Sequence, residues 1–395
     1  MKTHAMHLRH TPRRGQTMPV VPRLLHVVTG RYLWLPIGAI TALIWANTAP
    51  ESYFTFALAL AFPVNAIAMV FFFGLLAQEL YEEMMPGGAL HHRRRWPVPL
   101  IAGAGGVIGA AATFVAWTIW KTTPLLTGNW GVVAGIDIVF AYFTVRAIFH
   151  RHPAVAFLLL VAVGSNAIGF IALAPAFLFD GVRTGGSGLM MAVAIGLAAW
   201  LRRKRVRQFW PYVVVCGSLS WLALYLESFP PALALVPIVP FMPHTRRGLG
   251  ELLDDDADAG AKTPRHYEHV WHYHVQVALL LFGLVNAGVM FGGHGEGTDA
   301  TFVASIAGRV VGILAATALA LAIGLHLPAQ VGWRELIVVA LAASAGFTFV
   351  LYFAVALLPA GPLLAELKLG ALFTVVALPL AVGVAWALRV GRFQR

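Results

Sequence analysis

A succession of long apolar segments is the feature that most limits what this chain can fold into. About twelve segments are apolar and long enough to be candidate membrane spans. Of the 395 residues 59% are hydrophobic, and the mean hydropathy of +0.76 excludes a soluble domain of this size. The sequence therefore predicts an all-α polytopic membrane protein. The predicted spans lie near 31–48, 54–77, 98–119, 131–147, 154–173, 187–201, 210–226, 229–243, 270–291, 302–324, 336–358 and 369–389.

Basic residues are distributed very unevenly between the two sides of these spans. With the N-terminus in the cytoplasm, only Lys121, Arg183 and Lys368 fall in outer segments, and only Arg309 falls well inside a span. The rest of the 28 lysines and arginines lie in inner segments, which predicts that both termini are cytoplasmic. The run of basic residues at 202–207 is then a topology anchor. The net charge of +11 needs no nucleic-acid partner to explain it.

The chain divides by composition into four parts. Residues 1–30 are a basic cytoplasmic tail, and residues 31–243 hold the first eight spans. Residues 244–268 are polar, acidic and rich in glycine and alanine, which indicates a cytoplasmic linker. Residues 269–395 hold the last four spans and a short C-terminal tail. The eighth span is rich in proline, so we expect it to be bent or broken.

Charged and polar residues occur at one depth in three of the spans. Asp137 lies in the fourth span, Ser165 and Asn166 in the fifth, and Arg309 in the tenth. At ~1.5 Å per residue, all of them lie ~10–13 Å below the outer edge of the bilayer. Buried charge in a membrane is costly and usually functional, so these residues are candidates for an ion-binding site. A structural Asp–Arg pair that holds the bundle together is the alternative.

Glycines next to these polar residues predict two broken helices. Gly131 and Gly135 precede Asp137, and Gly346 lies in the middle of the eleventh span. Half-helices that end inside a membrane expose dipole ends, which Asp137 and Arg309 could neutralise. One break in each half of a chain is typical of secondary transporters with inverted repeats. The residues expected at the two breaks and their crossing are Gly135, Ile136, Ser344, Gly346 and Thr348.

Several longer stretches make a family resemblance visible. Together, in this order and at this spacing, they resemble the NhaA family of bacterial Na+/H+ antiporters over nearly the whole chain. The resemblance implies a bacterial inner-membrane protein with inverted repeats, in which two broken helices cross. The matching stretches are ALIWANTAPESY, MVFFFGLLAQELYEEM, HHRRRWPVPLIAGAGG, GNWGVVAGIDIVFA, FGLVNAGV, VGWRELIVVALAASAGFTFVLYFA and AELKLGALF.

The resemblance assigns roles to individual residues and also reveals departures. Asp137 matches the family's acid in the broken fourth helix, and Arg309 stands where the family has a buried lysine. The family's paired aspartates of the fifth helix, which bind the cation and exchange protons, are replaced by Ser165 and Asn166. Serine and asparagine can coordinate sodium through neutral oxygens, but neither releases a proton near neutral pH. Arginine, unlike lysine, stays protonated, so an anion could also bind beside Arg309.

A further group of residues lies near the cytoplasmic side. In the family's second-helix pattern Gln78 replaces an acid and Glu82 retains one, so both are candidates for pH sensing. His269 and His272 share a helix face at the start of the ninth span and are candidates for the same role. A haem or metal site built from these histidines is an alternative, and interfacial histidines beside aromatic anchors are the simpler interpretation. No cofactor is expected.

These observations favour a secondary active transporter and not an enzyme. The first hypothesis is a monovalent cation/proton antiporter that moves Na+ or Li+ against H+ across the lipid bilayer. Two alternatives remain: a diverged member that moves another solute such as an anion, and a transport-inactive membrane sensor. A homodimer is possible, although the first external segment is short for the hairpin through which the family dimerises.

Overall fold

The structure is a computed structural model, and it describes residues 34–84, 97–150, 152–178, 185–227, 229–243, 266–328 and 330–394. Within these ranges the chain forms helices and turns and contains no β-strand. The predicted basic tail lies outside the described residues, as does the predicted linker up to residue 265. The last three residues of that linker begin a helix.

The helices vary widely in length, and several are joined end to end by short 3-10 or π-helical turns. The α-helices are α2 (Trp34–Thr48), α3 (Pro50–Phe62), α4 (Met69–Met84), α5 (Pro97–Trp120), α6 (Pro124–Thr127), α7 (Ile138–Phe149), α8 (Pro153–Leu178), α9 (Gly185–Arg203), α10 (Gly217–Leu226), α11 (His266–Asn286), α12 (Glu296–Val303), α13 (Arg309–Ala322), α14 (Trp333–Ala343), α15 (Phe347–Leu357), α16 (Pro362–Phe373) and α17 (Ala377–Ala387). The π-helical segments are Pro63–Ala68, Tyr212–Cys216 and Ala304–Gly308, and the 3-10 segments are Trp130–Ala134, Pro231–Leu233, Val239–Phe241, Phe291–Gly293, Thr374–Val376 and Gly391–Phe393.

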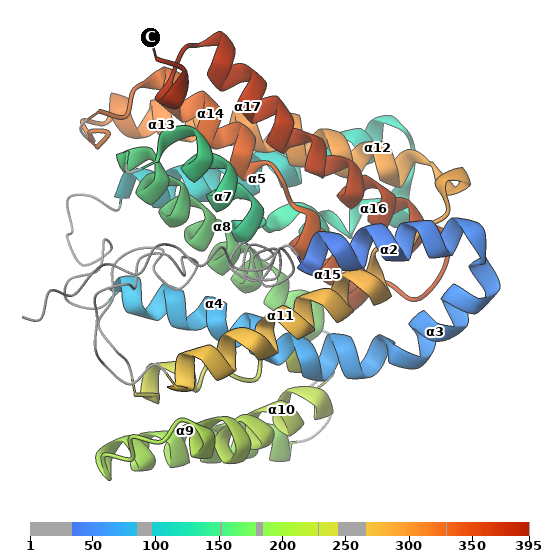
Figure 1. Ribbon diagram of the computed structural model, residues 1–395, viewed down its shortest axis with the longest axis vertical. Helices are drawn as coiled ribbons and strands as arrows, with labels where there is room; N and C mark the ends of the chain where they lie inside the picture. The colour runs from blue at the N-terminus through green and yellow to red at the C-terminus, as the bar shows by residue number, and fades with distance from the viewer. Residues whose placement is uncertain are drawn as a thin grey trace, which may run out of the picture.

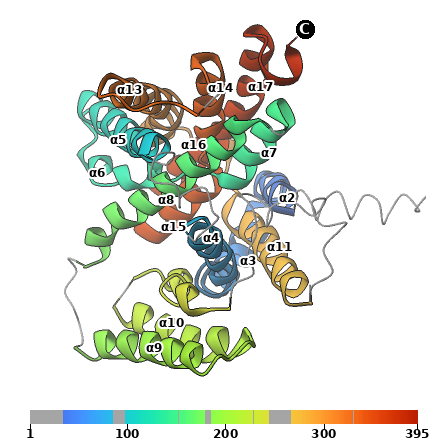
Figure 2. The same ribbon diagram turned by 90° about the vertical axis from the view of Figure 1, so that its left-hand side faces the viewer.

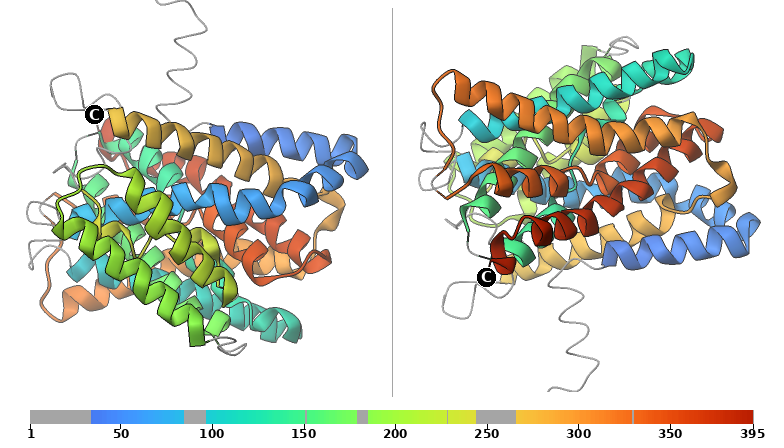
Figure 3. Two further views of the ribbon diagram at one scale, coloured as in Figure 1. Left: turned by 90° about the horizontal axis from the view of Figure 1, so that it is seen from below. Right: turned by 90° about the horizontal axis from the view of Figure 1, so that it is seen from above.

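The long helices run broadly side by side and form a bundle (Figure 3). Helices α9 and α10 lie together at one edge of the bundle (Figures 1 and 2). At the opposite end, α5 lies beside α13, and α14 beside α17 (Figure 2). Helix α8 and the short helices α7 and α15 lie between these two ends (Figure 2).

Seven helical segments of the described chain are long and apolar enough to cross a membrane. They include segments that the sequence predicts almost to the residue, such as Pro97–Trp120 and Trp130–Phe149. Two shorter apolar helices, Tyr212–Leu226 and Tyr273–Asn286, fall in the predicted seventh and ninth spans. The described part of the chain is therefore that of a helical membrane protein. The larger count of about twelve spans stays a prediction.

Prolines fix where many of the helices begin. Pro50, Pro124 and Pro362 each occupy the first turn of a helix, where a residue without an N–H group leaves no hydrogen bond unmade. The proline-rich segment 229–243 contains only two 3-10 turns and no α-helix. The expectation that the eighth predicted span is bent or broken is confirmed, because proline interrupts the helical hydrogen-bond ladder.

Close helix packing between α5 and α13 depends on glycine. A Cβ atom built on Gly312 would overlap the carbonyl oxygen of Gly105, and one on Gly109 would overlap that of Gly308. Small residues of this kind let two helix backbones approach within a membrane, where lipid supplies no hydrophobic drive between helices. The contact holds α13, and with it Arg309 at its first position, against α5.

Candidate functional site

The predicted fourth span is interrupted near its middle. The 3-10 segment Trp130–Ala134 ends at Gly135, whose backbone is extended (φ −86°, ψ 155°). Asp137 is also extended, and α7 begins at the next residue. A side chain at Gly135 would overlap the ring of Phe349, so the chain can pass α15 here only with glycine. The interruption comprises Gly135, Ile136 and Asp137.

The predicted eleventh span is interrupted in the same way. Helix α14 ends at Ala343, α15 begins at Phe347, and the three residues between them are not helical. The Ser344 hydroxyl donates to the carbonyl of Leu341 at 2.6 Å, which satisfies one acceptor at the end of α14. The main-chain N–H of Gly346 donates to the Thr374 hydroxyl at 3.2 Å. Both interruptions are buried.

The two interruptions contact each other through Asp137. Its main-chain N–H donates to the carbonyl of Ala345 at 2.9 Å. One carboxylate oxygen accepts from the N–H of Phe140 at 3.2 Å, in the first turn of α7. The other accepts from the N–H of Thr348 at 3.0 Å and from the Thr348 hydroxyl. The carboxylate is 2% exposed. It therefore lies at the positive ends of two helices, α7 and α15.

Arg309 contacts the C-terminal, partially negative end of a helical segment. Its side chain is completely buried, and its Nη2 donates to the carbonyl of Val133. Val133 lies near the C-terminal end of the 3-10 segment, where carbonyl groups lack partners and carry partial negative charge. Asp137 and Arg309 form no ion pair with each other, although both are fully described. The alternative of a structural Asp–Arg pair is therefore wrong, because each charge faces a different helix end.

Asn166 and Ser165 are held by the backbone of neighbouring segments. The Asn166 amide oxygen accepts from the N–H of Ile136 at 2.7 Å, and its nitrogen donates to the carbonyl of Ile136 at 3.0 Å. The amide thus replaces both hydrogen bonds that the Ile136 peptide loses at the helix interruption. The Ser165 hydroxyl donates to the carbonyl of Gly103 on α5 at 3.0 Å. Neither side chain faces lipid, since both are buried.

A cavity of about 410 Å³ lies beside Asn166. Ser165 lies outside the cavity, and Asn166 is its single polar residue. The other lining side chains are apolar because α4, α8 and the segment 229–237 present phenylalanine, leucine, valine and proline there. These residues include Phe73, Phe170, Phe229, Leu233 and Pro237.

A second cavity of about 650 Å³ lies on the other side of an aromatic cluster. It is lined in part by Asn65, Tyr225 and Tyr352. The rings of Phe73 and Tyr352 have centroids 4.6 Å apart and lie between the two cavities. Asn65 also exchanges hydrogen bonds with Asn286, at 2.8 and 3.2 Å. Sequence reasoning missed this pair, although an asparagine within an apolar run beside Pro63 is a recognisable signal.

Comparison with known proteins agrees with this architecture. The sequence profile described as Na+/H+ antiporter 1 matches residues 24–387. The chain belongs to this family. In this family member, two of the apolar segments are interrupted.

Individual relatives of the antiporter family cover nearly the whole chain. The Na(+)/H(+) antiporter NhaA of Desulfitobacterium hafniense is 39% identical over 357 residues, which are 88% of this chain and 91% of the relative. The NhaA of Geobacter metallireducens is 39% identical over 365 residues, or 90% and 95% of the two chains. The NhaA of Geobacter sulfurreducens is 36% identical over 364 residues, with the same coverage. The resemblance inferred from the sequence is confirmed.

The remaining candidate residues of this family member lie at one end of two helices. Gln78 lies on α4, and its side chain is half-buried. Glu82 also lies on α4, while His269 and His272 lie in the first turns of α11. The side chains of these three lie outside the described residues, so their role in pH sensing stays a prediction. In the described part of the chain, no three histidine, cysteine or acidic side chains gather as a metal site would require.

Proposed function

We propose that this protein is a secondary active transporter that exchanges Na+ or Li+ for H+ across a bacterial inner membrane. The proposal is supported by its family and by relatives that carry the name Na(+)/H(+) antiporter over about nine-tenths of the chain. The residue that carries the proposal is Asp137. It is the one fully buried acid of the described chain and lies where two interrupted segments touch.

Exchange of a cation for a proton needs a group that can hold either one. A carboxylate does so, because it is neutral when protonated and negative when a cation is bound. Ser165 and Asn166 cannot release a proton near neutral pH, and Arg309 cannot lose one. Their backbone hydrogen bonds also leave Ser165 and Asn166 little freedom to turn toward an ion. We therefore assign the exchange to Asp137.

Thr348 is the neighbour that we assign to cation binding with Asp137. Its hydroxyl donates to the carboxylate, and its oxygen keeps lone pairs for a cation. Hard cations such as Na+ prefer oxygen ligands. Peptide groups at the interruption are further candidates, since Gly135, Ile136 and Ala345 are not part of a continuous helix. Protonation of Asp137 would remove the charge that holds the cation, which couples the two ions.

The architecture that we infer has two inverted repeats whose interrupted helices cross at Asp137 and Gly346. The hydrogen bond from Asp137 to Ala345 and the packing of α15 on the 3-10 segment support a crossing. Such sites allow one half of a transporter to rock against the other around a fixed ion. We further propose both termini in the cytoplasm, from the distribution of lysine and arginine. A homodimer belongs to the same proposal.

Ion flux in proteoliposomes tests the function. Purified protein is reconstituted with an imposed pH gradient, and NaCl, LiCl, KCl, choline chloride and choline bicarbonate are added in turn. We expect Na+ or Li+ to dissipate the gradient and the choline salts to have no effect. Asp137→Asn should abolish the response. Glu51→Gln, which neutralises an exposed acid in the first turn of α3, is the matched control and should retain it.

The same assay separates the alternatives. A response to chloride or bicarbonate without a response to Na+ or Li+ would make the protein an anion transporter and overturn the proposal. No response to any ion, from protein that is folded and correctly inserted, would identify a transport-inactive member of the family.

A further inference from the structure

A row of four buried polar side chains follows one face of α12 and α13. Thr298, Thr301, Ser305 and Arg309 are all fully buried. They are three or four residues apart, the spacing that brings side chains together on one helix face. The π-helical segment Ala304–Gly308 lies within the row. Segments of π-helix often accompany functional sites.

Several polar atoms of this row have no hydrogen-bond partner within the protein. They are the hydroxyl oxygens of Thr301 and Ser305 and the Nε and Nη1 groups of Arg309. By contrast, the buried Thr317, two turns further along α13, donates to the carbonyl of Ile313 at 2.7 Å. Buried polar atoms in folded proteins almost always have partners, which are ordered waters where protein groups do not reach. The row therefore requires a small polar ligand.

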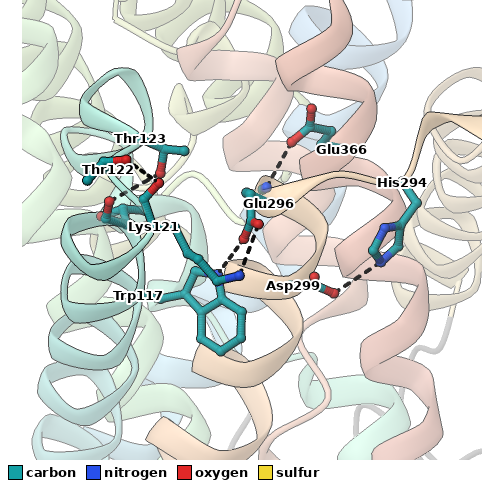
Figure 4. Close-up of polar contacts among 10 residues, drawn as sticks. Trp117, Lys121, Thr122, Thr123, His294, Glu296, Asp299 and Glu366 are labelled. Carbon is teal, nitrogen blue, oxygen red and sulfur yellow. Dashed lines mark hydrogen bonds and ion pairs between the residues drawn. The ribbon is translucent and has the colours of Figure 1, made fainter.

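One end of the row meets a charged cluster at the molecular surface (Figure 4). The Thr298 hydroxyl donates to the carbonyl of Glu366 at 3.0 Å, and the Glu366 carboxylate accepts from the N–H of Gly297 at 2.8 Å. In the same cluster, Lys121 pairs with Glu296 at 3.2 Å. His294 pairs with Asp299 at 3.1 Å, and these two side chains are 53% and 41% exposed. Water thus reaches the cluster beside this end of the row.

The other end of the row meets the interruptions that hold Asp137. The Ser305 hydroxyl lies 3.9 Å from the position that a Cβ on Gly346 would occupy. Gly346 is the neighbour of Ala345, whose carbonyl accepts from the N–H of Asp137. Arg309 reaches the carbonyl of Val133 in the other interrupted segment. The row thus connects the surface cluster with the proposed exchange site.

The spacing of the row suits water better than a bound anion. Side chains four residues apart on a helix have Cβ atoms ~5–6 Å apart, and one water with two hydrogen bonds of ~2.8 Å spans about that distance. Thr301 and Arg309 are ~12 Å apart along the helix axis, too far for one small anion to touch both. Hydroxyl groups also donate and accept at once, which a chain of waters needs and an anion does not.

We propose that Thr301, Ser305 and Arg309 bind a single file of water molecules that connects the surface cluster to Asp137 and carries its protons. The part that concerns protons rests on the proposed antiport function, whereas the presence of water does not. Each transfer passes one proton from a water or hydroxyl to the next, so that Asp137 gains or loses one proton at the end of the file. The file gives Asp137 a route to water that avoids the apolar cavity beside Asn166.

Reaction with silver ions tests for water independently of transport. The sequence has one cysteine, Cys216, so Cys216→Ala provides a background without thiols. Thr301→Cys and Ser305→Cys are compared with Ala304→Cys, which is buried on the same turn, and Val311→Cys, which is 64% exposed on the outer face of α13. In detergent, we expect silver to react at positions 301 and 305 about tenfold faster than at 304 and 311, since only the first pair contacts water. Equal rates at all four positions would overturn the proposal.

Proton flux then tests the route. Ser305→Ala and Thr301→Val should slow Na+-driven proton flux severalfold, and Ser305→Thr, which keeps the hydroxyl, should restore it. Thr317→Val is the control and should leave flux unchanged. Replacement of chloride by gluconate should also leave flux unchanged, and a loss would assign the free donors to an anion and overturn the proposal. Unaltered flux in Ser305→Ala would also overturn the proposal. Absence of any Na+-driven flux in the natural chain would refute the antiport function while the silver result still decides the presence of water.

Discussion

Thr348 donates its main-chain N–H to the carboxylate of Asp137 at 3.0 Å, across 211 residues of sequence. The contact joins the first turn of α15 to the residue that precedes α7. A single negative charge therefore neutralises the positive ends of two helices that come from different halves of the chain. This sharing makes Asp137 both a structural residue and the best candidate for ion exchange.

Asp137→Asn should weaken the fold as well as abolish transport. The substitution removes the charge that faces two helix ends and weakens the hydrogen bonds from Thr348 and Phe140. We expect a loss of ~2–4 kcal/mol in the free energy of unfolding. Unfolding by sodium dodecyl sulfate in mixed micelles measures it. Thr348→Val removes only the hydroxyl and should cost ~1 kcal/mol. An Asp137→Asn protein as stable as the natural one would contradict the double-cap arrangement.

The effects of replacing Asp137 and Arg309 should add. Because the two residues form no ion pair, Asp137→Asn with Arg309→Gln should lose nearly the sum of the single losses, with a coupling below ~1 kcal/mol. A direct buried ion pair would instead give a coupling of ~3–5 kcal/mol, with the double variant recovering much of the loss. A double-mutant cycle of unfolding free energies distinguishes these results.

Restoring an aspartate in the fifth span should lower the stability of the protein. The family's paired aspartates suggest that, in a Na+ antiporter, Ser165→Asp and Asn166→Asp would strengthen Na+-driven flux. In the structure an aspartate at 166 would place a carboxylate oxygen against the carbonyl of Ile136, where the amide nitrogen now donates. We expect Asn166→Asp to lose ~2 kcal/mol at pH 8 from the broken hydrogen bond. The loss should shrink at pH 5, where a protonated aspartate can donate. Thermal stability in detergent at both pH values measures this, and equal stability at pH 8 would contradict it.

Gly135→Ala should destabilise the interruption. The added methyl group would overlap the ring of Phe349, which is buried among other aromatic rings and has little room to move. Overpacking of this kind costs ~1–3 kcal/mol. Phe349→Leu in the same chain should recover part of the loss by making room. Gly383→Ala, at a helical position with open space around it, is the matched control and should change stability little.

Substitutions at Glu366 and Glu296 in the charged cluster should affect stability to different extents. Glu366 is partly buried and accepts a hydrogen bond from the first turn of α12, so Glu366→Gln should cost ~1 kcal/mol. Glu296 pairs with Lys121 near the surface, where solvent screens the charges, so Glu296→Gln should cost less than ~0.5 kcal/mol. The smaller effect should disappear in 1 M salt, and the larger one should persist. Unfolding in mixed micelles at two salt concentrations measures both.

The sequence by itself determined the class of fold and the position of the candidate site. Lipid offers no hydrogen-bond partners, so every spanning helix must pair its own backbone N–H and C=O groups. Apolar length alone therefore identifies helices such as Pro97–Trp120. The same physics makes Asp137 and Arg309 conspicuous, because a charge within an apolar run is rare unless it has a function. Gly135 indicated an interruption because it lies beside Asp137, and Gly346 did so because it lies in the middle of a span between Ser344 and Thr348.

Only the tertiary structure decided what each side chain of the site contacts. Depth along a helix placed Asp137, Asn166 and Arg309 together, but the direction in which each points depends on how helices rotate and pack, which periodicity does not fix. Asn166 therefore proved to bind the Ile136 peptide, and Arg309 to face Val133 instead of Asp137. The unpartnered hydroxyls of Thr301 and Ser305 were equally hidden in the sequence, because a hydrogen bond depends on neighbours that are distant along the chain and near in space.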